Sequence, residues 1–480
     1  MTGNGTKTIL SLIFLAGTAS ANDGWTVLEP VKDSRVVYVS SSAGADANSG
    51  LSPESPKKAL TAGQSLVRNG HPDWLLLKCG DVWESESLFW KTSGDSESRK
   101  QVISSYDEGP RPVIKNGKWR CWEKKRPLQH FAIIGIDFYA SFNDPASPDY
   151  QLGESADNAV EVLSPGASDI LLEGNRFRNY PTNVQIRGAL DTLITNVDIR
   201  RNTFTDSRGF GLLLTWVDGG LLEENTFDRS GWETRTKFLH NAYVKENLHF
   251  TARGNIFSRG GNFGLKISSD HKEAFAHFVV EDNLFYLDAL SIGHSKRATG
   301  YNPDIDFGTR YGVVSQNVFM SPAKTLPHDS TDVQAVAMIT ENMADITFDA
   351  NVFIHNTEQS GGGIVLGHSP KEKSANITFT NSLMSDWKSN WFKNSGTYIK
   401  KTESIDGFSQ DNNFETGVQY TDPMRDLVSY SKFIGGTEDS EAFLSRAAVQ
   451  SRANWDPRFT AAAFNDYIRN GFCIKKDRPE

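Results

Sequence analysis

Residues 197–227 read VDIRRNTFTDSRGFGLLLTWVDGGLLEENTF, and one short phrase occurs in them twice. It consists of asparagine, any residue and phenylalanine, at Asn202/Phe204 and again at Asn225/Phe227. A short, largely apolar segment precedes the phrase, and a second apolar segment, often opened by glycine, follows it. Helical periodicity is absent, and turns rich in Gly, Asn and Asp separate the apolar segments, so the stretch predicts strands of a few residues each.

The phrase returns along the middle of the chain at a near-regular spacing of 23 to 34 residues. Matching copies begin at Asn175, Asn202, Asn225, Asn255, Asn283, Asn317 and Asn351, and a degenerate copy begins at Asn381. One repeat of this length cannot bury its own apolar face, so successive copies must stack. We therefore predict an all-β fold, a right-handed parallel β-helix. Its phenylalanines would stack in the interior, and its asparagines would hydrogen-bond between coils at a turn, as structural rather than catalytic residues.

The two ends of the chain differ from the repeats. We expect a short helix at about 55–68 to cap the N-terminal end of the solenoid, which would otherwise present unpaired strand edges. The patterns at 440–454 and 460–470 predict helices. The expected organisation is a β-helix domain with its cap over 22–390, then closing strands and a helical tail, packed on the solenoid, over 391–480.

The first residues read as an export signal. Lys7 precedes an apolar run at 9–16, and Ala19-Ser20-Ala21 matches a small-residue cleavage site. We expect residues 1–21 to be removed and the mature protein to be secreted or periplasmic. The apolar run is too short to span a bilayer, and no later segment is long enough, so no membrane span is predicted.

The composition narrows the classes of partner. The 480 residues carry a net charge of −9, which argues against a general nucleic-acid binder, because such proteins rely on clustered Lys and Arg. Three cysteines permit at most one disulfide, and scattered histidines make a zinc site improbable. A local basic patch can still attract an acidic ligand, because net charge describes only the whole surface.

The sequence resembles the secreted right-handed parallel β-helix, or pectate-lyase-like, superfamily over nearly the whole mature chain. Besides the Asn-x-Phe copies, the resemblance rests on residues 38–50, 105–114, 240–244, 454–456 and 467–472. That superfamily includes polysaccharide lyases, uronan epimerases, glycoside hydrolases and phage tailspikes. A fold does not choose among such activities, so the choice depends on the site.

A candidate site follows from strand alternation, because side chains in a strand point alternately inward and outward. If Leu265 and Ile267 point inward, Lys266 points outward, and its neighbour on the preceding coil is Tyr243. The same outward column contains Gln185, Leu213 and Ser291. The next outward column contains Arg187, Thr215, Lys245, Ser268 and Gly293.

These columns and their flanks form a basic and aromatic strip in an otherwise acidic protein. We expect the catalytic residues to be Lys266, Tyr243 and His240. We expect substrate-binding residues at Arg187, Lys245, His294, Lys296, Arg297 and Asn241. Two long insertions, at 295–310 and 322–332, would wall the groove. Taken singly, each lysine is more simply explained as a solvated surface residue; the grouping favours a site for an acidic polysaccharide.

The chemistry that suits this strip is β-elimination from a uronate polymer, as in a polysaccharide lyase. A cation must neutralise the substrate carboxylate, a base must remove the adjacent proton, and an acid must protonate the leaving oxygen. We assign the base to Lys266 or His240, the acid to Tyr243, and the clamp to Arg187 or Arg297. Tyr243 acting as both base and acid is a close variant, and alginate is the favoured polymer.

Alternatives remain open at this point. A uronan epimerase would use the same groups, and a sugar-binding or tailspike-like solenoid would use the aromatic residues without catalysis. The Asp pair expected of polygalacturonase-like hydrolases is missing. We expect no cofactor and a monomer. Calcium stays possible at Asp206, Glu223, Glu224 and Asp228, although it needs six to eight oxygen ligands.

Overall fold

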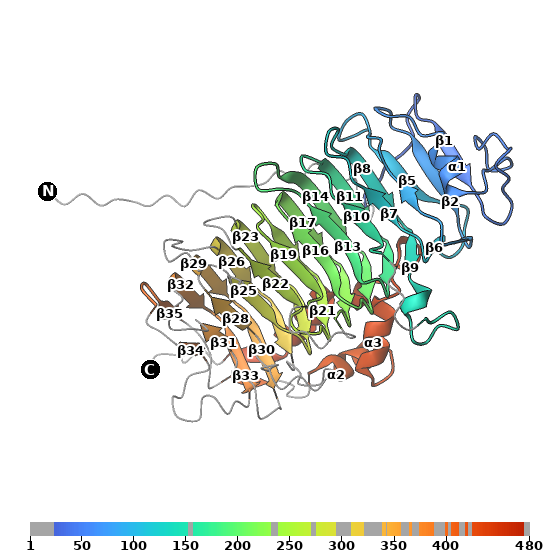
Figure 1. The fold of residues 1–480 in the computed structure, drawn as a ribbon. Coiled ribbons are helices and arrows are strands. Elements are labelled where there is room, and N and C mark those ends of the chain that lie inside the picture. Colours follow the sequence, from blue (N-terminus) through green and yellow to red (C-terminus); the bar gives the residue numbers. More distant parts are fainter. Residues whose placement is uncertain are drawn as a thin grey trace, which may run out of the picture.

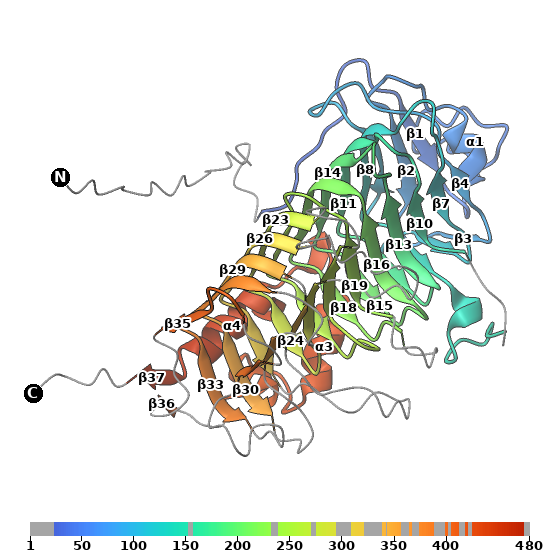
Figure 2. The same cartoon turned by 60° about the vertical axis from the view of Figure 1, so that its left-hand side comes forward.

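The computed structural model describes residues 24–151, 157–231, 239–269, 275–293, 309–320, 338–341, 343–356, 364–366, 374–387, 399–401, 405–411, 418–420 and 425–474. The predicted export signal at 1–21 lies outside these residues. Three all-parallel sheets wind around one core, and each coil contributes one strand to each sheet in turn (Figures 1 and 2). The predicted all-β parallel β-helix is confirmed.

The three sheets are named A, B and C. Sheet A contains β1 (Val36–Val39), β2 (Trp74–Lys78), β5 (Gln101–Tyr106), β8 (Gln129–Ile134), β11 (Ser168–Glu173), β14 (Ile194–Arg200), β17 (Val217–Glu223), β20 (Thr251–Arg253), β23 (Phe275–Glu281), β26 (Thr309–Ser315), β29 (Met343–Asp349), β32 (Ala375–Thr380) and β35 (Ser409–Asp411). Sheet B contains β3 (Val82–Glu84), β6 (Val113–Lys115), β9 (Asp137–Tyr139), β12 (Arg176–Arg178), β15 (Thr203–Thr205), β18 (Thr226–Asp228), β21 (Ile256–Ser258), β24 (Leu284–Tyr286), β27 (Val318–Met320), β30 (Val352–Asn356) and β33 (Leu383–Trp387).

Sheet C contains β4 (Leu88–Phe89), β7 (Trp119–Cys121), β10 (Val160–Val162), β13 (Thr182–Arg187), β16 (Phe210–Thr215), β19 (Ala242–Lys245), β22 (Leu265–Ser268), β25 (Leu290–Gly293), β28 (Met338–Glu341), β31 (Ile364–Leu366) and β34 (Ile399–Lys401). Outside the solenoid, β36 (Val418–Tyr420) and β37 (Phe472–Ile474) form an antiparallel pair. The α-helices are α1 (Leu60–Gln64), α2 (Leu427–Phe433), α3 (Ser440–Ala447) and α4 (Ala461–Arg469). Short 3-10 turns lie at Ser141–Asn143, Arg452–Asn454 and Pro457–Phe459.

The repeated phenylalanines form the predicted interior stack. Ring centroids of Phe204 and Phe227 are 4.4 Å apart, and those of Phe227 and Phe257 are 5.1 Å apart. The stack runs through Phe138, Phe177, Phe204, Phe227, Phe257, Phe285, Phe319 and Phe353. All of these rings are buried, so the stack supplies a continuous apolar core along the solenoid.

The repeated asparagines form a ladder at the turn between sheets A and B. The side chain of Asn225 accepts from the main-chain N–H of Asn202 and donates to the side-chain oxygen of Asn255, both at 3.0 Å. The same pattern repeats from Asn175 to Asn351. The asparagines are therefore structural, as predicted.

The degenerate copy sits one residue away from its predicted position. Ser382, rather than Asn381, takes the ladder position, and its hydroxyl accepts from the main-chain N–H of Asn351 at 3.3 Å. Asn381 adopts φ 51°, the left-handed conformation that the residue before each ladder position adopts, as Arg201 and Glu224 do at 52°. Asparagine tolerates this conformation well, which explains why it stands at this place in the turn.

The N-terminal cap is shorter than predicted: α1 starts at Leu60 rather than near residue 55. Residues before it pair with β1 instead, because the main chain of Lys57 exchanges hydrogen bonds with Tyr38 and Ser40. Leu60 is fully buried against the first coil. A short helix therefore still covers the end of the core, while the preceding segment satisfies the edge strand.

The C-terminal tail packs on the outer face of sheet B (Figures 1 and 2). In one outward column of that sheet, the N-terminal coils carry Arg176 and Thr203, whereas later coils carry Ile256, Leu284 and Val318. This apolar part of the column packs with Phe443, Leu444, Phe464 and Ile468 of the tail. The predicted helix at 440–454 ends at 447, and 3-10 turns at Arg452–Asn454 and Pro457–Phe459 follow it. The guanidinium of Arg111 donates to the main-chain oxygens of Gly174 and Gln450 and so fastens the tail to the solenoid.

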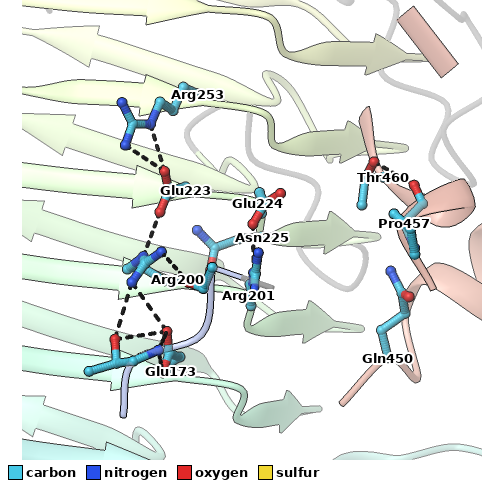
Figure 3. A network of polar contacts seen from close by, with 12 residues as sticks. Glu173, Arg200, Arg201, Glu223, Glu224, Asn225, Arg253, Gln450, Pro457 and Thr460 are labelled. Atoms are coloured by element: carbon cyan, nitrogen blue, oxygen red, sulfur yellow. Dashed lines mark hydrogen bonds and ion pairs between the residues drawn. The ribbon is translucent and has the colours of Figure 1, made fainter. Parts of the chain in front are cut away.

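A row of alternating charges on sheet A holds the first described segment (Figure 3). The Glu173 carboxylate accepts from the main-chain N–H of Thr26 at 3.1 Å and lies 3.3 Å from Arg200. Arg200 also pairs with Glu223 at 2.5 Å, and Glu223 pairs with Arg253 at 2.6 Å. Burial raises the pKa of Glu173, and the neighbouring Arg200 opposes this effect. The charges thus join four successive coils and the N-terminal segment.

Candidate functional site

The strand pairing of sheet C has the register that the sequence predicted. Tyr243 stands opposite Lys266 across β19 and β22, and Lys245 stands opposite Ser268. The outward column extends from Gln185 through Leu213, Tyr243 and Lys266 to Ser291. The neighbouring column extends from Arg187 through Thr215, Lys245 and Ser268 to Gly293. Apolar residues between them, such as Val244 and Ile267, are fully buried, which fixes the outward direction of the site residues.

Tyr243 and Lys266 reach the outer surface side by side. The ammonium of Lys266 lies 5.7 Å from the centre of the Tyr243 ring and 5.9 Å from that of the Phe263 ring. The hydroxyl of Ser268 donates to the phenol oxygen of Tyr243 at 3.0 Å. A cation and a phenol therefore stand together over an aromatic floor.

His240 lies beneath this surface rather than on it. Its side chain is 1% exposed and packs among the rings of Phe210, Tyr243 and Phe263, with centroids 5.4 to 6.0 Å away. Burial, assisted by the charge of Lys266, lowers the pKa of His240 well below its ordinary value, so the ring is neutral. Its Nδ1 has no hydrogen-bond partner among the described residues. In this structure the predicted base therefore cannot touch a substrate, because its ring lies beneath the surface just before β19 begins.

Asn241 was expected to bind substrate, and the structure contradicts this expectation. Its side chain is fully buried, and its oxygen accepts from the main-chain N–H of Ser230 at 3.1 Å. Its amide donates to the main-chain oxygen of Ser258 and, at 2.7 Å, to the carboxyl of Asp288. Its oxygen and both of its amide hydrogens bond inside the fold, so Asn241 is a structural residue.

Two predicted substrate-binding cations lie on the same face as the central pair. The Arg187 side chain is exposed at the end of β13. The Lys245 ammonium is 4.0 Å from the buried carboxylate of Glu246, which the hydroxyl of Ser269 also contacts at 2.7 Å. Arg187 and Lys245 thus share one outward column beside Tyr243 and Lys266.

Other predicted positions lie outside the described residues. These are His294, Lys296 and Arg297, together with the insertion at 295–308 and the insertion at 322–332. The groove walls and the Arg297 clamp therefore stay predictions.

The acidic residues considered for calcium are paired with arginines. Glu223 contacts two of them, Arg200 and Arg253, and the other three pair as Glu224 with Arg201, Asp206 with Arg229 and Asp228 with Arg259. No group of three or more His, Cys, Asp or Glu side chains arranged to hold a metal occurs in the described part of the chain. These carboxylates serve to join coils. A calcium site elsewhere in the chain stays a prediction.

Sequence reasoning missed two residues of this surface, Phe210 and Phe263, and one contact, that of Ser268. Phe210 and Phe263 stand at the entry to neighbouring strands and flank His240, and Ser268 bonds to the phenol of Tyr243. A signal for the two phenylalanines existed, because each precedes the glycine that opens its strand segment. Ser268 was placed in the correct column, but only the observed distance links it to Tyr243.

The chain was compared with known proteins. Residues 155–300 match the family model of the right handed beta helix region. The chain is similar to the lacto-N-biosidase of Bifidobacterium longum subsp. longum, with 31% identity over 125 residues. That match covers 25% of this chain and only 8% of the lacto-N-biosidase.

Solved structures show similarity at low identity. XylC in complex with xylose is 9% identical, with coverage of 81% of this chain and 88% of that chain, at a TM-score of 0.47. The PL6 family alginate lyase AlyGC is 12% identical, with coverage of 79% of this chain and 51% of that chain, at a TM-score of 0.45.

Among the described helices, none has the length and apolar character needed to cross a membrane. The family match and the three parallel sheets together identify the chain as a right-handed parallel β-helix protein, the fold that its resemblance to the pectate-lyase-like superfamily implied.

Proposed function

We propose that the protein is an exported enzyme that cleaves an acidic, uronate-containing polysaccharide by β-elimination. The observation that supports this proposal is the Tyr243–Lys266 pair, on adjacent strands of sheet C, facing outward. Arg187 and Lys245 add positive charge on the same face. A surface with these groups suits a negatively charged sugar chain, because the cations offset the substrate carboxylates.

The proposed reaction needs three groups. Lys245, on the same strand as Tyr243, neutralises the carboxylate of the uronate, which makes the proton on the adjacent carbon acidic. Lys266 in its neutral form takes that proton, and the released electron pair forms a carbon–carbon double bond as the glycosidic C–O bond breaks. Tyr243 donates its phenol proton to the leaving oxygen. Tyr243 can also perform both transfers, with Lys266 then stabilising the phenolate.

Neighbouring residues have supporting roles in this scheme. Ser268 donates to the phenol oxygen of Tyr243, which orients its proton outward and stabilises negative charge after the transfer. His240, neutral and buried, packs edge-on to the Tyr243 ring and holds its position. His240 is therefore a positioning residue, and the base is Lys266 or Tyr243.

The second candidate is a uronan epimerase, in which the carbanion is reprotonated from the opposite face. The same face of sheet C favours it, because the base and the carboxylate clamp are shared by both reactions. The two reactions differ in product: elimination creates an unsaturated sugar end, whereas epimerisation changes configuration without cleavage. A sugar-binding solenoid would do neither.

The test uses the mature protein, starting near Asn22, and a panel of uronate polymers with alginate first. We expect ultraviolet absorbance from unsaturated uronate ends to rise, and Lys266→Ala or Tyr243→Phe to abolish the rise. Matched controls are Lys432→Ala on α2 and Tyr311→Phe on sheet A, which should retain activity. Full activity in both site variants would refute the assignment. A change in uronate configuration by NMR, with no rise in absorbance, would favour the epimerase.

A further inference from the structure

The outer face of sheet C continues from the candidate site toward the N-terminal end of the solenoid. The Tyr243 column extends back through Glu161 to Arg120 and to Phe89. In the neighbouring column, the main-chain N–H of Leu163 donates to Cys121 at 2.8 Å, which continues the β7–β10 pairing beyond the ends of the strands. Trp122 therefore stands opposite Leu163, in the column that leads to Arg187 and Lys245.

Trp122 is an unusual residue on this face. Its side chain is 54% exposed, whereas those of Trp25, Trp83, Trp90 and Trp119 are buried. The guanidinium of Arg120 lies 3.8 Å from the centre of its ring. Glu161, bonded to Arg120 at 2.5 Å, fixes that guanidinium in place. The indole is thus held by a rigid neighbour while much of its surface stays open to solvent.

The register sets the distance between Trp122 and the candidate site. Five strand-to-strand steps separate β7 from β22, through β10, β13, β16 and β19. Neighbouring strands lie about 4.8 Å apart, so Trp122 is about 24 Å from Lys266 along the solenoid axis. A linear polysaccharide that lies along this axis can contact both, whereas a short oligosaccharide cannot.

The surface between these two points suits an acidic chain. Arg187 lies two steps from Trp122, and Lys245 lies two steps further along the same column. Between Trp122 and Lys266, the acidic residue of these two columns is Glu161. Its side chain is 6% exposed and is bonded to Arg120 and Asn158. The other charged side chains of these two columns, those of Arg120, Arg187, Lys245 and Lys266, are positive, and beside them Asp157 pairs with Arg120.

We propose that Trp122 is a distal sugar-stacking subsite for a uronate polysaccharide that runs across sheet C along the solenoid axis. This inference rests on the proposed function and extends it: the enzyme prefers long chains, because the polymer occupies both the Tyr243–Lys266 site and the indole. An open aromatic face is the group that binds the apolar face of a sugar ring. Arg187 and Lys245 hold the carboxylates between the two ends.

The experiment measures binding in the Lys266→Ala background, where no polymer is consumed. Affinity for a long uronate polymer and for a short oligosaccharide is measured with Trp122 intact, with Trp122→Ala, and with Trp122→Phe. We expect Trp122→Ala to reduce the ratio of polymer affinity to oligosaccharide affinity by about tenfold, the effect of losing one aromatic stacking contact. Trp122→Phe should restore part of the ratio. Tyr311→Ala, an exposed aromatic residue on sheet A, is the matched control and should leave the ratio unchanged.

Failure of the proposed function and failure of the Trp122 subsite give different results in this experiment. If protein with Trp122 and Lys266 intact neither binds nor cleaves any uronate polymer, the proposed function and the subsite are both overturned. If that protein cleaves the polymer, but Trp122→Ala leaves the affinity ratio unchanged, only the subsite is overturned. An equal loss for long and short ligands would also overturn it, because a residue about 24 Å from Lys266 cannot contact a short ligand bound there.

Discussion

The asparagine ladder offers a sharp test of what holds the solenoid together. The perturbation is Asn225→Ala, in the middle of the ladder. The Asn225 amide donates to the main-chain oxygen of Ile199 at 2.7 Å and to Asn255 at 3.0 Å. Its oxygen accepts from the main-chain and side-chain nitrogens of Asn202 at 3.0 and 3.2 Å. The substitution removes all four hydrogen bonds at once.

The expected loss in the free energy of unfolding depends on which groups lose their hydrogen-bond partner. The Asn202 amide group still donates to Leu172, and the side-chain oxygen of Asn255 still accepts from the main chain of residue 225. The Asn202 main-chain N–H is left unpaired inside the protein, whereas the Ile199 carbonyl loses one donor and keeps its place in the ladder of sheet A. An unpaired buried N–H costs about 1–3 kcal/mol and the other lost hydrogen bonds cost about 1 kcal/mol, so the free energy of unfolding should fall by about 3 kcal/mol.

The assay is denaturant unfolding followed by circular dichroism, together with hydrogen exchange of main-chain amides near the ladder. Exchange is needed because a repeat protein can open coil by coil, so a single midpoint can hide a local change. The control is Asn69→Ala, an exposed asparagine with one hydrogen bond to the Ser93 N–H, which should change stability by less than about 1 kcal/mol. A similarly small change for Asn225→Ala, with normal protection of neighbouring amides, would refute the reasoning.

Three further predictions concern the core, the buried carboxyl and the phenol. Phe227→Ala should lower the free energy of unfolding by about 3–5 kcal/mol, measured by calorimetry, because it opens a cavity in the ring stack. Burial raises the pKa of Asp288 to about 7 from an ordinary value of 3.8. The folded protein therefore holds that proton more tightly, and stability should fall as pH rises from about 4 to about 7; melting temperatures of Asp288→Asn should lack this decline. Ser268→Ala should reduce turnover about tenfold with little change in substrate affinity, because Tyr243 loses its orienting hydrogen bond, and steady-state kinetics would measure it.

Most of the fold could be predicted because one repeat carries two independent signals. The phenylalanine must be inward and the asparagine must be at a turn, so each copy fixes the register of its coil. Where one signal is missing, the register becomes ambiguous. At 381–384 the ladder position is Ser382 and the stack position is Met384. Because Asn381 stands next to Ser382, the repeat pattern in the sequence placed the ladder position one residue too early.

Less of the site could be predicted, because alternation applies only within strands. Tyr243 and Lys266 lie inside β19 and β22, and their outward direction was predicted correctly. His240 and Asn241 lie just before β19, where strand alternation does not apply, and both are buried. Burial also changes the chemistry: it keeps His240 neutral, whereas a histidine on the surface could exchange protons with a substrate.

The same apolar residues that stabilise sheet C also position the proposed chemistry. A shift of one residue in β22 would bury Lys266 and expose Leu265 and Ile267, which are fully buried. The free energy of burying those two side chains, about 1.5–3 kcal/mol each, therefore holds the Lys266 ammonium beside Tyr243. Variants that weaken this part of the core, such as Ile267→Ala, should thus reduce turnover per folded molecule as well as stability. Loss of stability alone, with normal turnover, would show that the pair does not need the register that the core imposes.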